Sequence, residues 1–312
     1  MGTIYIFKRF RLLVAAYFVL STLYIVPSFA QQDAQYSLYM FNHLAVNPAY
    51  AGSRDAFSTA FVYRDQWVNL KGAPTTAMLS AHMPLKQNKV GLGAEIFTDK
   101  LGPRSTSAVQ FSYAYRIPFS TGKLAFGLRA GIFNYVYDWS ALDFKDNGDP
   151  YDTQSSSSKI TGTADFGLHY YSRTFYCGFS STHLNQGRMS EFTGDSTRQS
   201  RHSFFTMGKS FKWGRTVVNP VLLVKSATGA PGTADLGVNF LLKEKWWIGI
   251  SFRSAYGIVF LSQYQINEKF RVGYAYDYGR NAIGRVGGGS HEIMLGYDLN
   301  IMGAKISMPR YL

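Results

Sequence analysis

The sequence predicts an all-β fold, a transmembrane antiparallel β-barrel of about 14 strands preceded by a non-strand N-terminal segment. Hydrophobic residues make up 46% of the 312 residues and charged residues 16%, which excludes a disordered chain. After residue 30, however, no apolar run approaches the roughly 18 to 20 residues of a membrane-spanning helix. From residue 56 onward the apolar residues instead recur at every second position, which is the period of a β-strand.

Residues 1–30 have the pattern of a secretory signal peptide. Lys8, Arg9 and Arg11 form a basic start, residues 12–26 are mostly apolar, and Ser28 and Ala30 are small residues at a cleavage site. We expect the exported chain to begin at Gln31, which lowers the formal net charge from +13 to +10.

The two faces of each predicted strand differ in a way that favours a membrane barrel over a soluble sandwich. In residues 269–279, Phe270, Tyr274 and Tyr278 share one face, while Gly273 and Asp277 lie on the other. The second face is dominated by Gly, Ala, Ser and Thr with single charges, as expected in a crowded polar interior. The bulky face is then expected to contact lipid.

The same reasoning assigns individual residues to lipid or lumen. Leu128 should face lipid, whereas Ala125, Gly127 and Arg129 should face the lumen. Arginine should therefore be tolerated at Gly127 or Ala125 far better than at Leu128.

Fourteen segments show the alternation, although twelve strands remain an alternative because the link near 253–256 is short. They cover residues 56–66, 74–84, 88–98, 104–117, 122–138, 160–172, 174–183, 201–213, 215–226, 232–243, 245–253, 255–266, 269–279 and 289–300. Long links (139–159, 184–200 and 280–288) alternate with short turns, as in barrels with external loops and periplasmic turns. Tryptophans near segment ends are expected to form interfacial girdles: Trp67, Trp139, Trp213, Trp246 and Trp247.

The sequence contains no recognisable catalytic, cofactor-binding or metal-binding motif. Gly208-Lys209-Ser210 lacks the earlier glycine of a phosphate loop, and Leu295 stands where a zinc helix beginning at His291 would need its second histidine. The other histidines (43, 82, 169, 183 and 202) are dispersed, and the acidic loop 143–152 matches no calcium-loop spacing. Basic residues are scattered singly, which disfavours nucleic acid as a partner. We therefore expect no enzyme activity and no cofactor.

Residues 31–55 do not alternate and lie ahead of the barrel. They could enter the lumen as a plug, bind a periplasmic partner, or form a lead-in strand on the barrel rim. The candidate plug or partner-binding residues are Tyr36, Tyr39, Asn42, Asn47, Pro48, Tyr50 and Gly52.

This segment and the first strands resemble the PorP/SprF family of type IX secretion system outer-membrane proteins. The resemblance rests on Gln35-Tyr36, Tyr39, Asn42 and residues 47–52 (NPAYAG), followed by 64–67 (RDQW), 72–75 (GAPT), 91–93 (GLG) and 99–103 (DKLGP). It implies a non-enzymatic part of a secretion and gliding-motility apparatus in the outer membrane. The implied partners are membrane lipid, periplasmic components of the machine and a secreted surface adhesin.

Two functional hypotheses follow for a chain organised as signal peptide 1–30, N-terminal segment 31–55 and barrel 56–312. The first is a barrel that binds adhesin cargo and periplasmic machine components. The alternative is an outer-membrane channel for hydrophobic or small solutes.

Overall fold

A computed structural model describes residues 33–85, 88–142, 156–189, 197–254 and 256–300. The predicted signal peptide, the whole acidic loop 143–152 and the C-terminal residues 301–312 lie outside these ranges. The strands are β1 (Phe57–Gln66), β2 (Thr75–Leu85), β3 (Val90–Leu101), β4 (Arg104–Pro118), β5 (Lys123–Tyr137), β6 (Ser157–Tyr171), β7 (Phe175–Thr182), β8 (His202–Lys209), β9 (Phe211–Trp213), β10 (Thr216–Ala227), β11 (Ala230–Leu242), β12 (Trp246–Arg253), β13 (Gly257–Gln265), β14 (Phe270–Gly279) and β15 (Ser290–Leu299).

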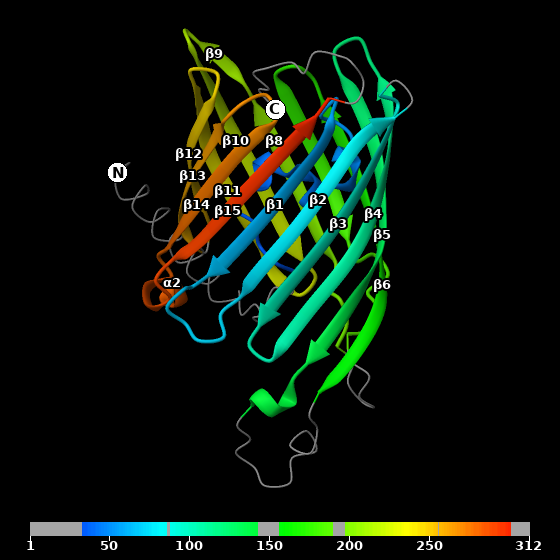
Figure 1. Ribbon diagram of the computed structural model, residues 1–312, viewed down its shortest axis with the longest axis vertical. Helices are drawn as coiled ribbons and strands as arrows, with labels where there is room; N and C mark the ends of the chain where they lie inside the picture. Colours follow the sequence, from blue (N-terminus) through cyan, green and yellow to red (C-terminus); the bar gives the residue numbers. More distant parts are fainter. Residues whose placement is uncertain (1–32, 86–87, 143–155, 190–196, 255, 301–312) are drawn as a thin grey trace, which may run out of the picture.

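The strands form one closed antiparallel barrel (Figure 1). Apart from β8 and β9, strands that are neighbours in the chain pair with each other, β1 pairs with β15, and β10 pairs with both β8 and β11. Fourteen strands make up the barrel wall, which confirms the predicted count. The link at 253–256 is as short as the sequence suggested and still joins two separate strands, because β12 and β13 pair up to Arg253 and Gly257.

The fifteenth strand, β9, is an extension that pairs only with β10. It arises because the predicted segment 201–213 is interrupted at Ser210, whose backbone N–H donates to the Thr174 carbonyl at 2.7 Å. Strand β7 begins at Phe175 and pairs there with Lys209, so residues beyond Lys209 have no β7 neighbour.

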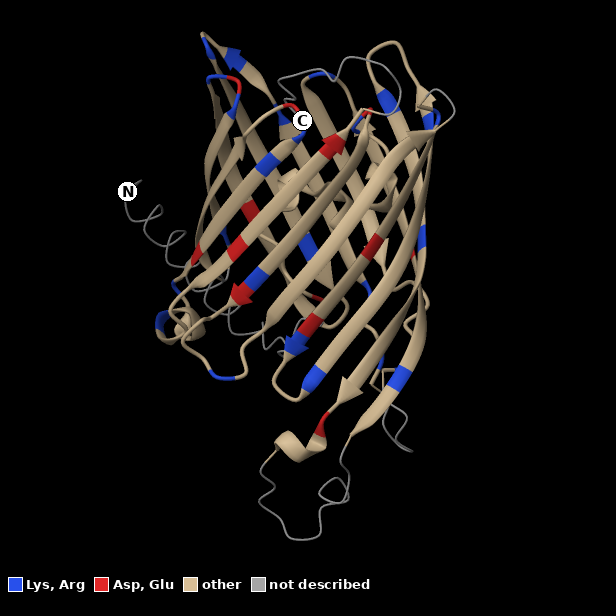
Figure 2. Cartoon of the chain, in the orientation of Figure 1, with Lys and Arg blue, Asp and Glu red and all other residues tan. Residues whose placement is uncertain are grey.

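Side chains alternate between the outside and the inside of the barrel, as predicted. Leu128 is 61% exposed, whereas Arg129, the next residue of β5, is 5% exposed. Exposed apolar side chains such as Phe111, Ile160 and Leu236 lie on the outer face of their strands. Figure 2 shows charged residues along the strands of the wall, and many of them are buried. The outer surface therefore suits lipid and the inner surface is polar.

Two of the tryptophans predicted to form the girdle are exposed, as a girdle requires, and the prediction is wrong for a third. Trp213 and Trp246 are 75% and 46% exposed, but Trp247 is buried at 8% and faces inward. Consecutive residues of a strand point to opposite faces, so Trp246 and Trp247 cannot both contact lipid.

The two ends of the barrel differ. At the turn end, where β1 begins and β15 ends, the connections are short. At the loop end lie the long connections, which carry η4 (Trp139–Ala141) and α2 (Ala282–Val286) (Figure 1). Among the described residues, no helix has both the length and the apolar character that crossing a bilayer requires.

Candidate functional site

Residues 33–55, here called the luminal segment, run through the interior of the barrel as three 3-10 turns (Figure 1). These are η1 (Tyr39–Phe41), η2 (His43–Ala45) and η3 (Pro48–Tyr50). The Asn47 side chain accepts a hydrogen bond from the Ala49 N–H at 2.9 Å and Pro48 follows it, a combination that starts a helical turn. Gly52, with φ of +70°, then lets the chain turn toward β1.

Four glycines on neighbouring strands bring the wall against the NPAYAG motif. This glycine cradle comprises Gly91 of β3, Gly127 of β5, Gly167 of β6 and Gly178 of β7. A Cβ on Gly127 would lie 2.5 Å or less from backbone atoms of Pro48 and Ala49, and one on Gly178 would lie 2.9 Å from Asn47 Nδ2. Gly127 faces the lumen as predicted, but the expectation that it tolerates arginine is wrong, because backbone occupies the space.

Hydrogen bonds fix the same stretch to the wall. Asn47 Nδ2 donates to the Leu168 carbonyl at 2.9 Å, and the Gly52 N–H donates to His82 Nδ1 at 3.0 Å. Arg116 donates to the Ala51 carbonyl and, at 3.1 Å, to the Val90 carbonyl. The segment therefore replaces wall–water hydrogen bonds with wall–segment hydrogen bonds.

The start of η1 is held by a buried ionic network. The backbone N–H groups of Ser37 and Leu38 donate to the two oxygens of Glu292, both at 2.8 Å. Ser37 Oγ donates to Asp277 at 2.7 Å. Arg64 bridges Asp277 at 2.7 Å and Glu292 at 3.0 Å, from its position opposite Glu292 in the β1–β15 register.

Two further arginines extend these contacts around the lumen. Arg253 binds Asp277 at 2.9 Å and Asp235 at 2.8 Å. Arg129 pairs with Glu95, pairs with Asp165 at 2.6 Å, and donates to the Leu44 carbonyl at 3.2 Å. The charges on the lumen face thus serve to neutralise one another and to hold the segment.

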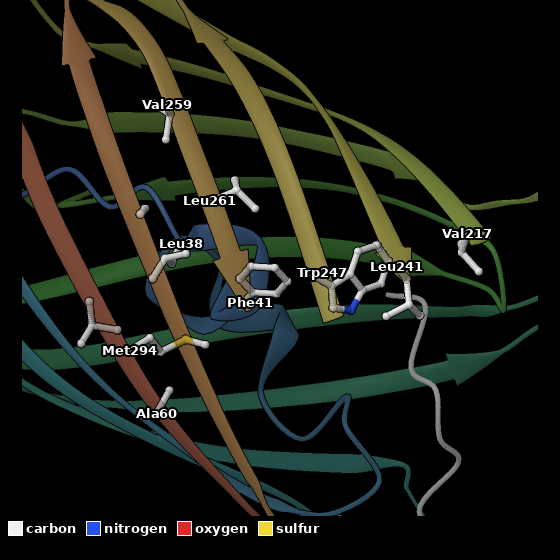
Figure 3. Packing of buried hydrophobic residues seen from close by; sticks show 11 residues of the cluster. Leu38, Phe41, Ala60, Val217, Leu241, Trp247, Val259, Leu261 and Met294 are labelled. Carbon is white, nitrogen blue, oxygen red and sulfur yellow. The ribbon is translucent and has the colours of Figure 1, made fainter. Parts of the chain in front are cut away.

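Apolar contacts complete the packing. Leu38 and Phe41 join a buried cluster of wall residues that includes Trp247, Leu261 and Met294 (Figure 3). The Phe41 and Trp247 rings are 6.5 Å apart.

Histidines that are scattered in the sequence gather around Tyr50. His43 stacks on Tyr50 at 5.0 Å, and the rings of His82 and His169 each meet Tyr50 edge-on at 5.5 Å. Burial, followed by repulsion from Arg54, lowers the pKa of His43 to about 4, so this ring is neutral at pH 7. The contacts of these rings make the cluster an aromatic packing layer around Tyr50.

The seven residues singled out from the sequence all lie in the luminal segment and contact the wall. Asn42 illustrates this, because its Oδ1 accepts from Ser80 Oγ at 3.2 Å. Six of the seven are buried and Tyr36 is half-buried: Tyr39, Asn42, Asn47, Pro48, Tyr50 and Gly52. Their role as a plug or a partner-binding motif stays a prediction.

The wall residues that hold the segment were missed by sequence reasoning. From the sequence, Arg116, Glu292 and the cradle glycines could be recognised only as residues on the small, polar face of their strands. A cavity also lies beside the segment between Tyr36, Tyr39 and wall residues such as Gln110 and Lys225. Among the described residues, Asp33, His183 and His202 lie close enough together to share a metal ion.

Comparison with protein-family models matches residues 28–297 to the type IX secretion system membrane proteins PorP/SprF. The chain belongs to the PorP/SprF family. The predicted family is confirmed, and family and fold together place this PorP/SprF protein in the outer membrane. Comparison with curated protein sequences finds no significant match.

Solved structures with a similar fold are outer-membrane proteins of low sequence identity. Omp33 of Acinetobacter baumannii is 10% identical, with 78% of this chain and 97% of that chain covered and a TM-score of 0.44. The toluene transporter TodX of Pseudomonas putida is 11% identical, with coverage of 87% and 95% and a TM-score of 0.47. A TodX deltaS2 mutant is 11% identical, covers 83% and 94%, and reaches a TM-score of 0.51. The last likeness supports the barrel fold alone.

Proposed function

We propose that this PorP/SprF protein is a non-enzymatic component of the type IX secretion and gliding machinery that binds proteins at the two ends of its barrel. Periplasmic machine components would dock at the turn end, and a secreted adhesin at the loop end. The observation that carries the proposal is the luminal segment, because a lumen filled and fastened in this way leaves the ends as the surfaces available to partners.

The luminal segment acts as a plug in this proposal. A solute crossing the barrel would have to displace backbone that touches the glycine cradle and two buried arginine networks. Withdrawing the segment leaves the buried Glu292 carboxylate without its two backbone donors, and a buried charged group that loses its hydrogen bonds costs more than the about 1–3 kcal/mol of a neutral one. Displacement is therefore an improbable step in every transport cycle, whereas a static plug is compatible with a scaffold.

The turn end carries a basic surface suited to an acidic partner. Eight exposed basic residues lie on or beside the described turns: Lys89, Arg173, Lys209, Lys212, Arg215, Lys243, Lys245 and Lys269. The exposed acids at this end of the described chain are Asp55, Glu244 and Glu268. Such an excess of one sign steers and orients an oppositely charged protein.

The loop end offers a different surface for cargo. Its described parts include η4 and α2, with Ile283 and Val286 exposed at 43% and 64%. Exposed apolar side chains on polar loops are a common feature of protein-binding sites. We assign the adhesin to this end because it faces the cell exterior in the orientation with periplasmic turns.

The proposal is tested by purifying the complex from native membranes by an affinity tag and quantifying named type IX components and adhesin by mass spectrometry. Lys212→Glu with Lys243→Glu should reduce periplasmic components severalfold and leave the barrel folded. Lys71→Glu with Arg285→Glu, at the loop end, is the matched control and should retain them. A barrel that purifies alone and conducts ions in a planar bilayer would refute the proposal.

The channel alternative would be favoured by that outcome. It draws on the cavity beside the luminal segment, which has a volume of about 80 Å³. That space holds roughly five to eight waters. A channel would also have to show conductance that rises when the luminal segment is loosened.

A further inference from the structure

Asp33, at the start of the luminal segment, lies between two histidines of the wall. Its Oδ1 is 3.0 Å from Nε2 of His183, which follows β7, and its Oδ2 is 3.0 Å from Nδ1 of His202, the first residue of β8. One ligand atom from each of the three residues lies within 4.8 Å of the others. The side chains of His183 and His202 are buried, and that of Asp33 is 25% exposed.

The hydrogen bonds around His183 determine which of its nitrogens carries a proton. Thr163 Oγ1 lies 3.2 Å from an oxygen of Asp165, which as a carboxylate can only accept, so Thr163 uses its single proton there. The 3.0 Å contact between Thr163 Oγ1 and His183 Nδ1 must then be an N–H donated by the histidine. In a neutral ring this leaves the lone pair of Nε2 directed at Asp33.

A lone pair and a carboxylate oxygen 3.0 Å apart repel each other unless a cation lies between them. That cation is either a proton on Nε2 or a metal ion. Two imidazoles and one carboxylate are a normal ligand set for zinc, with bonds of about 2.0 to 2.2 Å that separate the ligand atoms by about 3.4 Å. The two 3.0 Å contacts involve different oxygens of Asp33, and the three ligand atoms lie within 4.8 Å of one another, so side-chain movements of up to about 1.4 Å bring them to this spacing.

We propose that Asp33, His183 and His202 bind a divalent transition-metal ion, with zinc the best match to the ligand set. The chain from His183 Nδ1 through Thr163 to Asp165 then has the form of the outer-shell contacts that orient metal-bound histidines. The backbone N–H of His183 also donates to Asp165 at 2.9 Å, which fixes the residue from a second side.

His202 must change tautomer to take part. Its Nδ1 also lies 3.0 Å from the Ser200 carbonyl, an acceptor that favours a proton on Nδ1. Metal binding needs the Nδ1 lone pair, so the proton moves to Nε2, which is buried and has no hydrogen-bond partner among the described residues. The metal bond has to offset the loss of the bond to Ser200, and His202 is therefore the weakest of the three ligands.

The metal would fasten the luminal segment at its loop end. The segment is covalently joined to β1 at the turn end, whereas at the loop end its first described residues are held by noncovalent contacts such as those of Ser37 and Leu38 with Glu292. A metal bridge from Asp33 to the β7–β8 side of the wall adds an anchor at that end. The site thus couples metal availability to the position of the luminal segment.

The test uses the full mature protein in detergent, purified with a tag that contains no histidine and treated with a chelator. Titration with Zn²⁺ should show one site per barrel, and Co²⁺ should give the visible absorption of a nitrogen- and oxygen-ligated ion. His183→Ala and Asp33→Asn should each lower the affinity at least tenfold. Thr163→Val, which touches no metal, should lower it about 10- to 100-fold.

The control is His291→Ala, on a histidine of β15 that contacts Tyr274 and lies outside the cluster. It should bind metal like the unaltered protein. Because Asp33 lies outside the strands, Asp33→Asn is expected to leave the barrel folded, and it still tests the site if a wall variant fails to fold. Binding that survives Asp33→Asn, or no binding by the chelator-treated protein, would overturn the proposal and leave a proton as the bridging cation.

Discussion

The glycine cradle gives the sharpest test of how the luminal segment is held. In Gly127→Ala the new Cβ would lie 2.5 Å or less from three backbone atoms of Pro48 and Ala49. Carbon contacts need about 3.5–4.0 Å, so the segment has to move by about 1 Å or more. Overpacking of this kind costs about 1–3 kcal/mol, which raises the open population of the segment about 5- to 150-fold.

A buried reporter measures that opening. Ser53 Oγ is buried without a hydrogen-bond partner among the described residues, so Ser53→Cys is a conservative replacement. In a Cys177→Ser background, which removes the single native thiol, the rate of maleimide labelling reports the open state. Gly127→Ala should label about 5- to 150-fold faster, with the barrel still folded by circular dichroism.

The matched control is Gly162→Ala in β6, where the nearest atom to a new Cβ is 3.9 Å away. It should leave the labelling rate unchanged. If Gly127→Ala labels no faster than Gly162→Ala, the wall and the segment are not in backbone contact, and the plug reasoning fails.

Three other substitutions probe the barrel and its contents. Leu128→Arg should cost about 2–4 kcal/mol of stability in lipid, measured by urea unfolding in vesicles, whereas Val286→Arg on α2 should cost little. Equal losses would mean that Leu128 does not lie on the lipid-facing side of β5. Glu292→Gln should cost about 3–5 kcal/mol by leaving buried arginine charge, and the exposed Glu268→Gln should change thermal stability by less than about 0.5 kcal/mol. Trp247→Ala should lower the free energy of unfolding by about 3–5 kcal/mol and speed maleimide labelling of Ser53→Cys. Unchanged labelling would mean that the Trp247 ring faces lipid and not the luminal segment.

The barrel could be predicted from the sequence because each strand repeats one physical contrast many times. In β14, Phe270 and Tyr274 alternate with Gly273 and Asp277, and a shift of one residue would put the charge into lipid. The break at Ser210 was not predictable, because alternation within one strand carries no information about where its neighbour ends.

The interior was harder to predict. The position of a residue along a strand shows which face its side chain lies on, but not which groups lie within its reach. Gly127 and Arg129 share a face, yet one touches segment backbone and the other reaches two carboxylates. His183 and His202 are separated by a long loop, and only the pairing of β7 with β8 brings them to Asp33. No local pattern in the sequence records either relation.

The charges of the lumen explain why the luminal segment is part of the barrel and not an addition to it. The network around η1 contains two arginines and three carboxylates: Arg64, Arg253, Asp235, Asp277 and Glu292. The segment supplies further hydrogen-bond donors to these carboxylates, because two N–H groups at the start of η1 point at Glu292 and the Ser37 hydroxyl donates to Asp277. Wall and segment therefore satisfy each other's hydrogen bonds, and the polar face that the strands turn to the lumen is the binding site for residues 33–55 of the same chain.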